Sequence, residues 1–476
     1  MLFNSFEFLV FLPIVFLLYW FVFKKLKTQN ILVVVASYLF YGWWDWRFLI
    51  LIAFTTLCSY ASGILLERQE GHRHIQRWIS AANIVLNLII LCLFKYFNFF
   101  SENLAYIFRW LGFELDWVTL NILLPVGISF YTFQALSYTI DVYRNKIKPT
   151  HDIVAFFAFI SFFPQLVAGP IERATNLLPQ FEKPRTFDYT AAVDGMRQIL
   201  WGLFKKIVVA DTCAAAANQI FANYQTLDSL NLTWGAFLFT FQIYGDFSGY
   251  SDIAIGTAKL FGVSLQRNFN YPYFSRDIAE FWRRWHISLT TWFRDYIYIP
   301  LGGSRCSKWK SFRNTMIIFL VSGLWHGANW TFICWGAFHA LLFLPLLLME
   351  KNRKYKDIVA KNKPLPSFKE IGQIIITFLL VMIGWVIFRA ENIKDACQYI
   401  FYMFTKWEPS SLGYGGRCVQ YILIMIVIEW IQRRQMHGLE ISRVKYPIIR
   451  WGLYCAIFYY IFYYSNSIQT FIYFQF

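Results

Sequence analysis

Residues 314–349 read NTMIIFLVSGLWHGANWTFICWGAFHALLFLPLLLM, a nearly unbroken apolar run. One transmembrane helix needs only about 20 apolar residues, so this run is too long for a single span. It also contains Gly323, Gly327 and Gly336, which weaken a continuous helix. We therefore expect two helices here, or one span that continues into another across a tight bend.

The rest of the chain has the same character. Of its 476 residues, 57% are hydrophobic, 21% are aromatic and only 15% are charged. So few charges cannot cover a soluble protein of this length, and so many apolar residues exclude a disordered chain. Apolar runs recur from residues 7–23 to residues 449–464. We interpret the chain as one all-α, polytopic membrane domain, residues 1–476, with room for roughly 10 to 13 spanning helices.

The net charge of +16 fits Lys and Arg in the cytoplasmic loops of a membrane protein. Nucleic-acid binding would need a basic soluble module, and none is recognisable, so no nucleic-acid partner is expected. The eight cysteines are scattered singly without a CxxC pair, which disfavours disulfides and structural zinc.

Loop charges also predict the orientation. Lys24, Lys25 and Lys27 follow the first apolar run, and the next basic loop, residues 67–77, comes two runs later. Both loops can be cytoplasmic only if the N-terminus lies outside. Residues 1–23 have neither a basic n-region nor a small-residue cleavage site, so we expect a retained span rather than a removable signal peptide.

Residues 265–313 interrupt the apolar pattern, because charges lie there among Trp, Tyr, Phe and Ile. Such a stretch suits re-entrant helices that dip into the membrane from the cytoplasmic side. On a helix, Glu280 and Arg284 can pair, while Arg283 and His286 share a face. The alternative is an amphipathic surface helix anchored to headgroups, which explains His286 poorly. The ionisable residues of this stretch include Arg276, Asp277, Glu280, Arg283, Arg284, His286, Arg294 and Asp295.

A second candidate site is VSGLWHGANW, residues 321–330, where His326 lies inside an apolar run. A buried imidazole within a membrane is costly and is usually functional. Gly323 and Gly327 allow another helix or a ligand to approach closely, and Asn329 could fix a ring nitrogen. His339 is predicted to face elsewhere on a continuous helix and to be structural.

Other polar residues in apolar surroundings are open to two interpretations. They are Asp246, Ser248 and Asp252 in DFSGYSDIAIG, and the Glu172–Arg173 pair that follows Pro164, Gly169 and Pro170. They could line a cavity, or they could simply form polar bonds between helices.

The sequence lacks Walker, GxGxxG, HExxH and GxSxG elements, so the corresponding chemistries have no support. A metal held by His286 and His326 would lack further ligands, so no metal is predicted. Two buried histidines favour general-base chemistry on an acyl donor. The alternative from another class is a polytopic transporter, which often shows related halves; no internal repeat is recognisable.

Several long motifs resemble the membrane-bound O-acyltransferase family, in particular its bacterial branch that includes alginate O-acetyltransferases. They lie in the family's order along almost the whole chain. The motifs are PVGISFYTFQALSYTIDVYR (125–144), QLVAGPIER (165–173), DFSGYSDIAIG (246–256), NFNYPYFS (268–275), FWRRWHISLTTWFRDYIYIPLGG (281–303), GLWHGANW (323–330), GWVIFRAEN (384–392) and FIYFQF (471–476).

The resemblance implies a ring of roughly 11 to 13 transmembrane helices plus re-entrant helices around a central tunnel. It implies that His326 is the catalytic base and that His286 orients or polarises the thioester carbonyl. Arg284, Arg294 and Asp295 would shape the surrounding cavity. Arg283, Trp325 and Asn329 are further candidates for its lining.

The resemblance also implies the substrates. The donor is expected to be cytosolic acetyl-CoA, used as a substrate rather than a bound cofactor, and guided by the basic region 276–310. The acceptor would be an extracytoplasmic polysaccharide or cell-wall polymer, reached directly or through a periplasmic or secreted acetyltransferase partner. The setting would be the lipids of the bacterial cytoplasmic membrane. D-alanyl transfer from a carrier-protein thioester to a teichoic-acid-like polymer is the alternative within the family.

Overall fold

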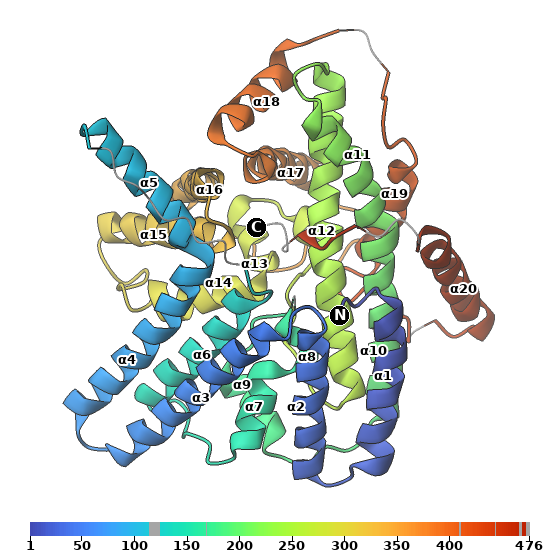
Figure 1. Ribbon diagram of the computed structural model, residues 1–476. Coiled ribbons are helices and arrows are strands. Elements are labelled where there is room, and N and C mark those ends of the chain that lie inside the picture. Colours follow the sequence, from blue (N-terminus) through green and yellow to red (C-terminus); the bar gives the residue numbers. More distant parts are fainter. Residues whose placement is uncertain (114–123, 168, 409–410, 443, 466–468, 473–476) are drawn as a thin grey trace. The chain divides into compact units, whose positions relative to one another are not determined.

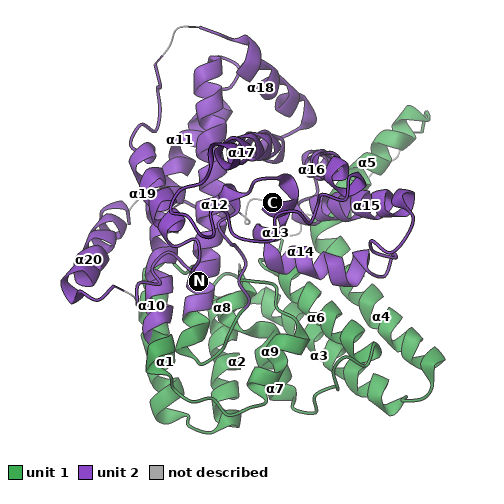
Figure 2. Ribbon diagram, turned by 180° about the vertical axis from the view of Figure 1, so that it is seen from behind, with its two compact units in different colours: residues 1–192, 257–265 green, residues 193–256, 266–476 purple. Residues whose placement is uncertain are grey.

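The computed structural model describes residues 1–113, 124–167, 169–408, 411–442, 444–465 and 469–472. Over these ranges all regular secondary structure is helical (Figure 1), which confirms the all-α prediction. The chain folds into two compact units, coloured separately in Figure 2. Unit 1 comprises residues 1–192 and 257–265, and unit 2 comprises residues 193–256 and 266–476.

Unit 1 is built from helices whose polar residues face one another. Helices α3, α4 and α6 pack together, as do α2 and α7. At the first of these contacts Asn83 donates to Thr139 Oγ1 at 2.7 Å, and the Ser62 hydroxyl lies 3.3 Å from the same oxygen. The helices are α1 (Phe6–Leu17), α2 (Leu26–Gly42), α3 (Arg47–Arg68), α4 (Arg73–Leu91), α5 (Phe97–Trp110), α6 (Ile128–Tyr143), α7 (Ile153–Ser161), α8 (Phe163–Leu166) and α9 (Ala174–Phe181), with the π-helices η1 (Leu18–Val22) and η2 (Cys92–Tyr96).

Unit 2 carries the stretches singled out in the sequence. The boundaries of the units fall within α10 (Tyr189–Leu203) and α12 (Ser229–Leu260). The other elements are η3 (Phe204–Ala210), α11 (Asp211–Ala222), η4 (Pro272–Phe274), α13 (Ile278–Arg284), α14 (Ile287–Phe293), η5 (Arg294–Tyr298), α15 (Lys308–His326), α16 (Trp330–Leu348), α17 (Phe368–Arg389), α18 (Ile393–Thr405), α19 (Cys418–Ile431) and α20 (Pro447–Tyr464).

Four helical stretches in the described ranges are long and apolar enough to cross a membrane. They are Arg47–Arg68, Arg73–Trp110, Trp330–Leu348 and Phe368–Arg389. Shorter apolar helices cover Phe6–Val22, Ile153–Leu166 and Cys418–Ile431. The chain is thus a helical membrane protein, while the larger number of spans stays a prediction.

The apolar run 314–349 forms two helices that pack against each other, α15 and α16, as its glycines predict. The first helix ends at His326, and the side chain of Asn329 caps the second by accepting from the Thr331 N–H. A Cβ at Gly323 would lie 2.2 Å from the carbonyl oxygen of Phe332. The two backbones therefore approach as closely as they do because this position has no side chain.

Gly323→Ala should destabilise the protein by about 1–3 kcal/mol, because the added methyl group meets backbone that cannot move aside. The measurement is the thermal midpoint of the purified protein in detergent. Gly372→Ala on α17 is the matched control, since nothing lies within 4 Å of the added Cβ there. Equal midpoints for the two variants would contradict the close packing of α15 against α16.

Candidate active site

His286 lies at the junction of α13 and α14, outside both helices. Asp277 caps α13 by accepting from the Glu280 N–H, and α13 ends at Arg284. His286 itself adopts a left-handed conformation, with φ 44° and ψ 55°. The expectation that Arg283 and His286 share a helical face was therefore wrong, because the helix stops between them. Left-handed backbone is unfavourable for a side chain such as His, so the surrounding contacts must hold it.

The predicted pair of Glu280 and Arg284 is present, with 2.7 Å between Arg284 Nη2 and Glu280 Oε1. Arg276 binds the same carboxylate, with its Nε 3.0 Å from Oε2. Both guanidinium groups also donate to the carbonyl oxygen of Asp357, and Arg283 donates to that of Asn352. This cluster ties α13 to the basic segment around residues 352–357, so Arg276 and Arg284 are occupied by protein groups.

Asn268 holds the imidazole of His286. Its Oδ1 lies 3.1 Å from His286 Nδ1 and accepts from the Ser288 hydroxyl at 2.9 Å. His286 is 1% exposed, and burial lowers the pKa of its imidazole to about 3. The ring is therefore neutral at physiological pH.

The structure brings the two predicted histidines together. His326 is the last residue of α15, and its ring centroid lies 6.5 Å from that of His286. His326 is only 4% exposed. The C-terminal end of a helix stabilises positive charge, so an imidazolium formed at His326 would be favoured there.

Aromatic rings form the walls around both imidazoles. Phe247 lies edge-on to His286, with centroids 4.7 Å apart, and Trp325 contacts both histidines. On the other side of His326, the ring centroids of Trp335 and Phe388 lie 5.2 Å and 5.4 Å away. Such walls exclude water, which strengthens every electrostatic interaction between them.

The prediction that Asn329 fixes a ring nitrogen of His326 was wrong. The Oδ1 of Asn329 caps α16 and its Nδ2 donates to the carbonyl oxygen of Glu391, so it does not fix a ring nitrogen of His326. The physical reason is that the helix ends at His326, which turns Asn329 into the cap of the next one. Arg294 pairs with Asp295 at 2.6 Å on η5, and its side chain is 57% exposed. A role of these two residues in shaping a cavity stays a prediction.

His339 lies closer to the site than the sequence indicated. It is fully buried on α16, and the ring of Trp335 contacts both His339 and His326. The predicted angular separation assumed one continuous helix, whereas α16 folds back on α15.

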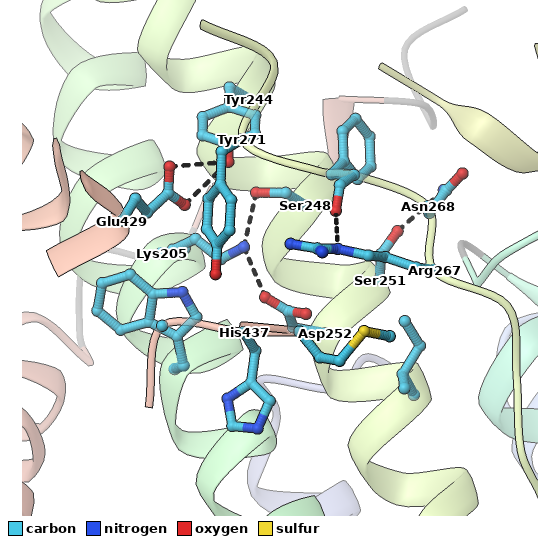
Figure 3. A pocket seen from close by; sticks show the side chains of 15 residues that line it. Lys205, Tyr244, Ser248, Ser251, Asp252, Arg267, Asn268, Tyr271, Glu429 and His437 are labelled. Atoms are coloured by element: carbon cyan, nitrogen blue, oxygen red, sulfur yellow. Dashed lines mark hydrogen bonds and ion pairs between the residues drawn. The ribbon is translucent and has the colours of Figure 1, made fainter. Parts of the chain in front are cut away.

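Asn268, which binds His286, also lines a small polar cavity (Figure 3). Lys205 binds Asp252 at 2.6 Å and the Ser248 hydroxyl at 2.8 Å, and Tyr244 donates to Glu429. The open volume is about 20 Å³, which suffices for roughly one water molecule. The cavity is too small for a substrate. Asp252 and Ser248 therefore fit both interpretations, because they line this cavity and also form polar bonds between helices.

Sequence reasoning missed a buried triad that anchors the C-terminal segment. Lys206 lies 2.7 Å from Asp211 and 2.9 Å from Asp246, and donates to the carbonyl oxygen of Gln469. Two successive lysines in an otherwise apolar run were the available signal.

The triad continues to the wall of the site. The Ile472 N–H donates to the carboxylate of Asp246 at 2.7 Å. Next to it, Phe471 packs on Tyr250 with centroids 4.2 Å apart and also contacts Phe247, the ring that faces His286. Residues 469–472 therefore brace one aromatic wall of the site.

The fold and this site together define an all-helical membrane protein in which two imidazoles face each other between aromatic walls. The sequence profile of MBOAT, the membrane-bound O-acyltransferase family, matches residues 39–388. The chain belongs to this family and is an O-acyltransferase, as its motifs predicted. Because the chain belongs to a family of acyltransferases, the alternative that it is a transporter is excluded.

Several proteins have sequences that align with much of this chain. The probable alginate O-acetylase AlgI of Pseudomonas aeruginosa is 41% identical, over 92% of this chain and 82% of that protein. The peptidoglycan O-acetyltransferase of Helicobacter pylori is 30% identical, over 100% of this chain and 98% of that protein. The teichoic acid D-alanyltransferase of Bacillus subtilis is 29% identical, over 57% of this chain and 70% of that protein.

Glu280→Gln should destabilise the protein by about 3–5 kcal/mol, because the buried guanidinium group of Arg284 loses its counter-charge. Arg276 also loses a partner but still pairs with Glu370 at 3.4 Å. The expected signs are a lower thermal midpoint and faster trypsin cleavage within residues 351–363. Asp357→Asn is the control, because that carboxylate is 74% exposed and pairs with Lys361, an arrangement worth less than about 1 kcal/mol. If both variants melted alike, the Glu280 cluster would not hold this segment.

Proposed function

We propose that the protein transfers an acetyl group from cytosolic acetyl-CoA to a hydroxyl of an extracytoplasmic polysaccharide or cell-wall polymer, directly or through a partner protein. The bacterial cytoplasmic membrane, with the N-terminus outside, is the proposed setting. The observation that carries the proposal is the pair of buried imidazoles, His286 and His326, 6.5 Å apart within aromatic walls. A base in such a site can take a proton from a hydroxyl that water would otherwise solvate.

The transfer itself needs one proton acceptor. In the proposed step His326 takes the hydroxyl proton while the hydroxyl oxygen attacks the acetyl carbon. The carbon–sulfur bond breaks, and the departing thiolate of CoA takes the proton back from the imidazolium. The products are an acetyl ester and the free thiol of CoA. The end of α15 supports this role because its dipole stabilises the transient positive charge.

Acetyl is favoured over D-alanyl by the relatives. The proteins named as acetylases or acetyltransferases align over 92% and 100% of this chain, whereas the D-alanyltransferase of B. subtilis aligns over 57%. Both reactions use a thioester and a hydroxyl acceptor, so the histidine pair would serve either. The donor therefore has to be distinguished by experiment.

His326→Ala should lower the rate of acetyl transfer by about 10²–10⁴-fold, the usual contribution of a general base. The assay follows release of the CoA thiol and acetyl ester formation on deacetylated alginate oligosaccharides. His339→Leu is the matched control: this buried imidazole also contacts Trp335, and its loss should reduce stability but not the rate per folded molecule. Equal rates for His326→Ala and the unmodified protein would refute the assignment. Turnover of a D-alanyl carrier-protein thioester, but not of acetyl-CoA, would favour the alternative donor.

Exposed basic residues near η5 and α15 are proposed to attract the phosphates of acetyl-CoA. Arg276 and Arg284 are bound to Glu280, whereas Arg305, Lys308 and Lys310 are exposed. Charges of this kind raise the local concentration of an anionic ligand.

Replacing Arg305, Lys308 and Lys310 together by Ala should raise the KM for acetyl-CoA several-fold at low ionic strength. The difference should shrink near 0.15 M salt, where the Debye length is about 8 Å. The control replaces three exposed residues of like charge elsewhere, Lys24, Lys25 and Lys27. A KM that changes equally in both triple variants would place the attraction in the overall charge rather than in this region.

A further inference from the structure

The amide of Asn268 has a defined orientation. Its Oδ1 faces the backbone N–H of Ser288 at 3.4 Å and the Ser288 hydroxyl at 2.9 Å. A backbone N–H can only donate, so the atom that faces it is the oxygen. On the other side, Nδ2 donates to Ser251 Oγ at 3.1 Å, the contact drawn in Figure 3. Asn268 is fully buried, so these contacts are not shared with solvent.

This orientation determines the tautomer of His286. Because Asn268 Oδ1 can only accept, the proton of the neutral imidazole lies on Nδ1 and is donated to it. Nε2 is left with a lone pair. This atom is buried and has no hydrogen-bond partner within the part of the chain that the structure describes. A buried acceptor without a partner is unfavourable unless a ligand or a water molecule donates to it.

We infer that Asn268 keeps His286 as a hydrogen-bond acceptor and thereby assigns His286 to the acyl acceptor rather than to the thioester carbonyl. The inference rests on the proposed function. A thioester carbonyl offers only lone pairs, so it cannot bind the lone pair of Nε2. A polysaccharide carries several O–H groups, and often N–H groups, that can. His286 is then a residue that positions the acceptor, in place of the carbonyl-polarising role implied by resemblance.

The spacing of the two rings fits this division. Hydrogen-bonded heavy atoms lie about 2.7–3.2 Å apart, and a centroid separation of 6.5 Å is too long for a direct bond between two imidazoles. The two rings are thus close enough for one acceptor molecule to contact both, although they do not bond to each other. One hydroxyl gives its proton to His326, and a second O–H or N–H of the same acceptor donates to His286 Nε2.

Burial supports the same conclusion, since it keeps His286 neutral. Among the described residues whose rings contact His286, the titratable one is His326; the others are Phe247, Phe269 and Trp325. His326 is present in every variant below, so differences between variants report His286.

Asn268→Asp is the decisive substitution. A carboxylate at this place favours the imidazolium, so the pKa of His286 should rise. Below that raised pKa, Nε2 carries a proton and cannot accept. A partner carboxylate can raise this pKa from about 3 to as high as about 6. The KM for deacetylated alginate oligosaccharides should therefore rise by up to about 10-fold as the pH falls to 5, and return to the value of the unmodified protein by pH 8. In the unmodified protein this KM should stay flat over the same range. Asn270→Asp, two residues along the same segment, is the control and should leave the profile flat.

A binding measurement tests the donor separately from the acceptor. Acetonyl-CoA is the ketone analogue of acetyl-CoA, so it keeps the carbonyl group but cannot transfer an acetyl group. Its Kd for His286→Ala and for Asn268→Asp should stay within about 2-fold of that for the unmodified protein, because His286 does not contact the carbonyl. A Kd more than about 5-fold higher in both variants would show that His286 contacts the thioester carbonyl and would overturn the inference. So would a pH-independent acceptor KM in Asn268→Asp.

Asn268→Leu covers the case in which Asn268→Asp is inactive. It removes the acceptor oxygen without adding charge, so the acceptor KM should rise while the Kd of acetonyl-CoA stays unchanged. Weakening of both in proportion would indicate a merely structural role. Failure of the proposed function looks different: the unmodified protein would not release CoA from acetyl-CoA, and acetonyl-CoA would not bind it.

Discussion

A charge removed from water must meet an opposite charge, and unit 2 is organised by this constraint. Burying an unpaired carboxylate or ammonium group costs several kcal/mol even after relaxation. The Lys206–Asp211–Asp246 triad and the Arg276–Glu280–Arg284 cluster satisfy the requirement in different ways. The triad forms hydrogen bonds with the backbone of residues 469–472. The arginines of the cluster donate to the carbonyl oxygen of Asp357. Each therefore fastens a segment distant in sequence to the helices beside the histidines.

The histidines themselves are placed by backbone more than by charge. His286 occupies a left-handed position between two short helices, and His326 occupies the end of α15 just before the chain turns into α16. Both positions interrupt helices, which leaves the side chains free to point between elements rather than along a helix face. The aromatic walls then exclude water from the two imidazoles. Interrupted helices buried within protein are the form that irregular backbone takes in a membrane.

Local sequence predicted those parts of the site that depend on local rules. The break in the run 314–349 followed from its glycines, and the Glu280–Arg284 pair followed from helical spacing. Asn268 was not identified, although it lies only 18 positions before His286, because a loop residue has no periodicity that shows what it will face. The contact of Lys206 with Gln469 spans 263 positions, and a single sequence contains no signal for such a pairing. The error at Asn329 has the same origin: its role depended on where the helix ended.

The two imidazoles therefore differ in their environments, and that difference is the basis for separate roles. Both rings are buried, but the amide of Asn268 gives the neutral His286 a defined tautomer. His326 lies at the end of a 19-residue helix, where the backbone carbonyl groups favour positive charge. A proton transfer between acceptor and thioester needs one group that can become charged and benefits from one that cannot. Sites that place similar titratable groups in contrasting surroundings assign them different roles, and here the contrast follows from the end of a helix and one buried amide.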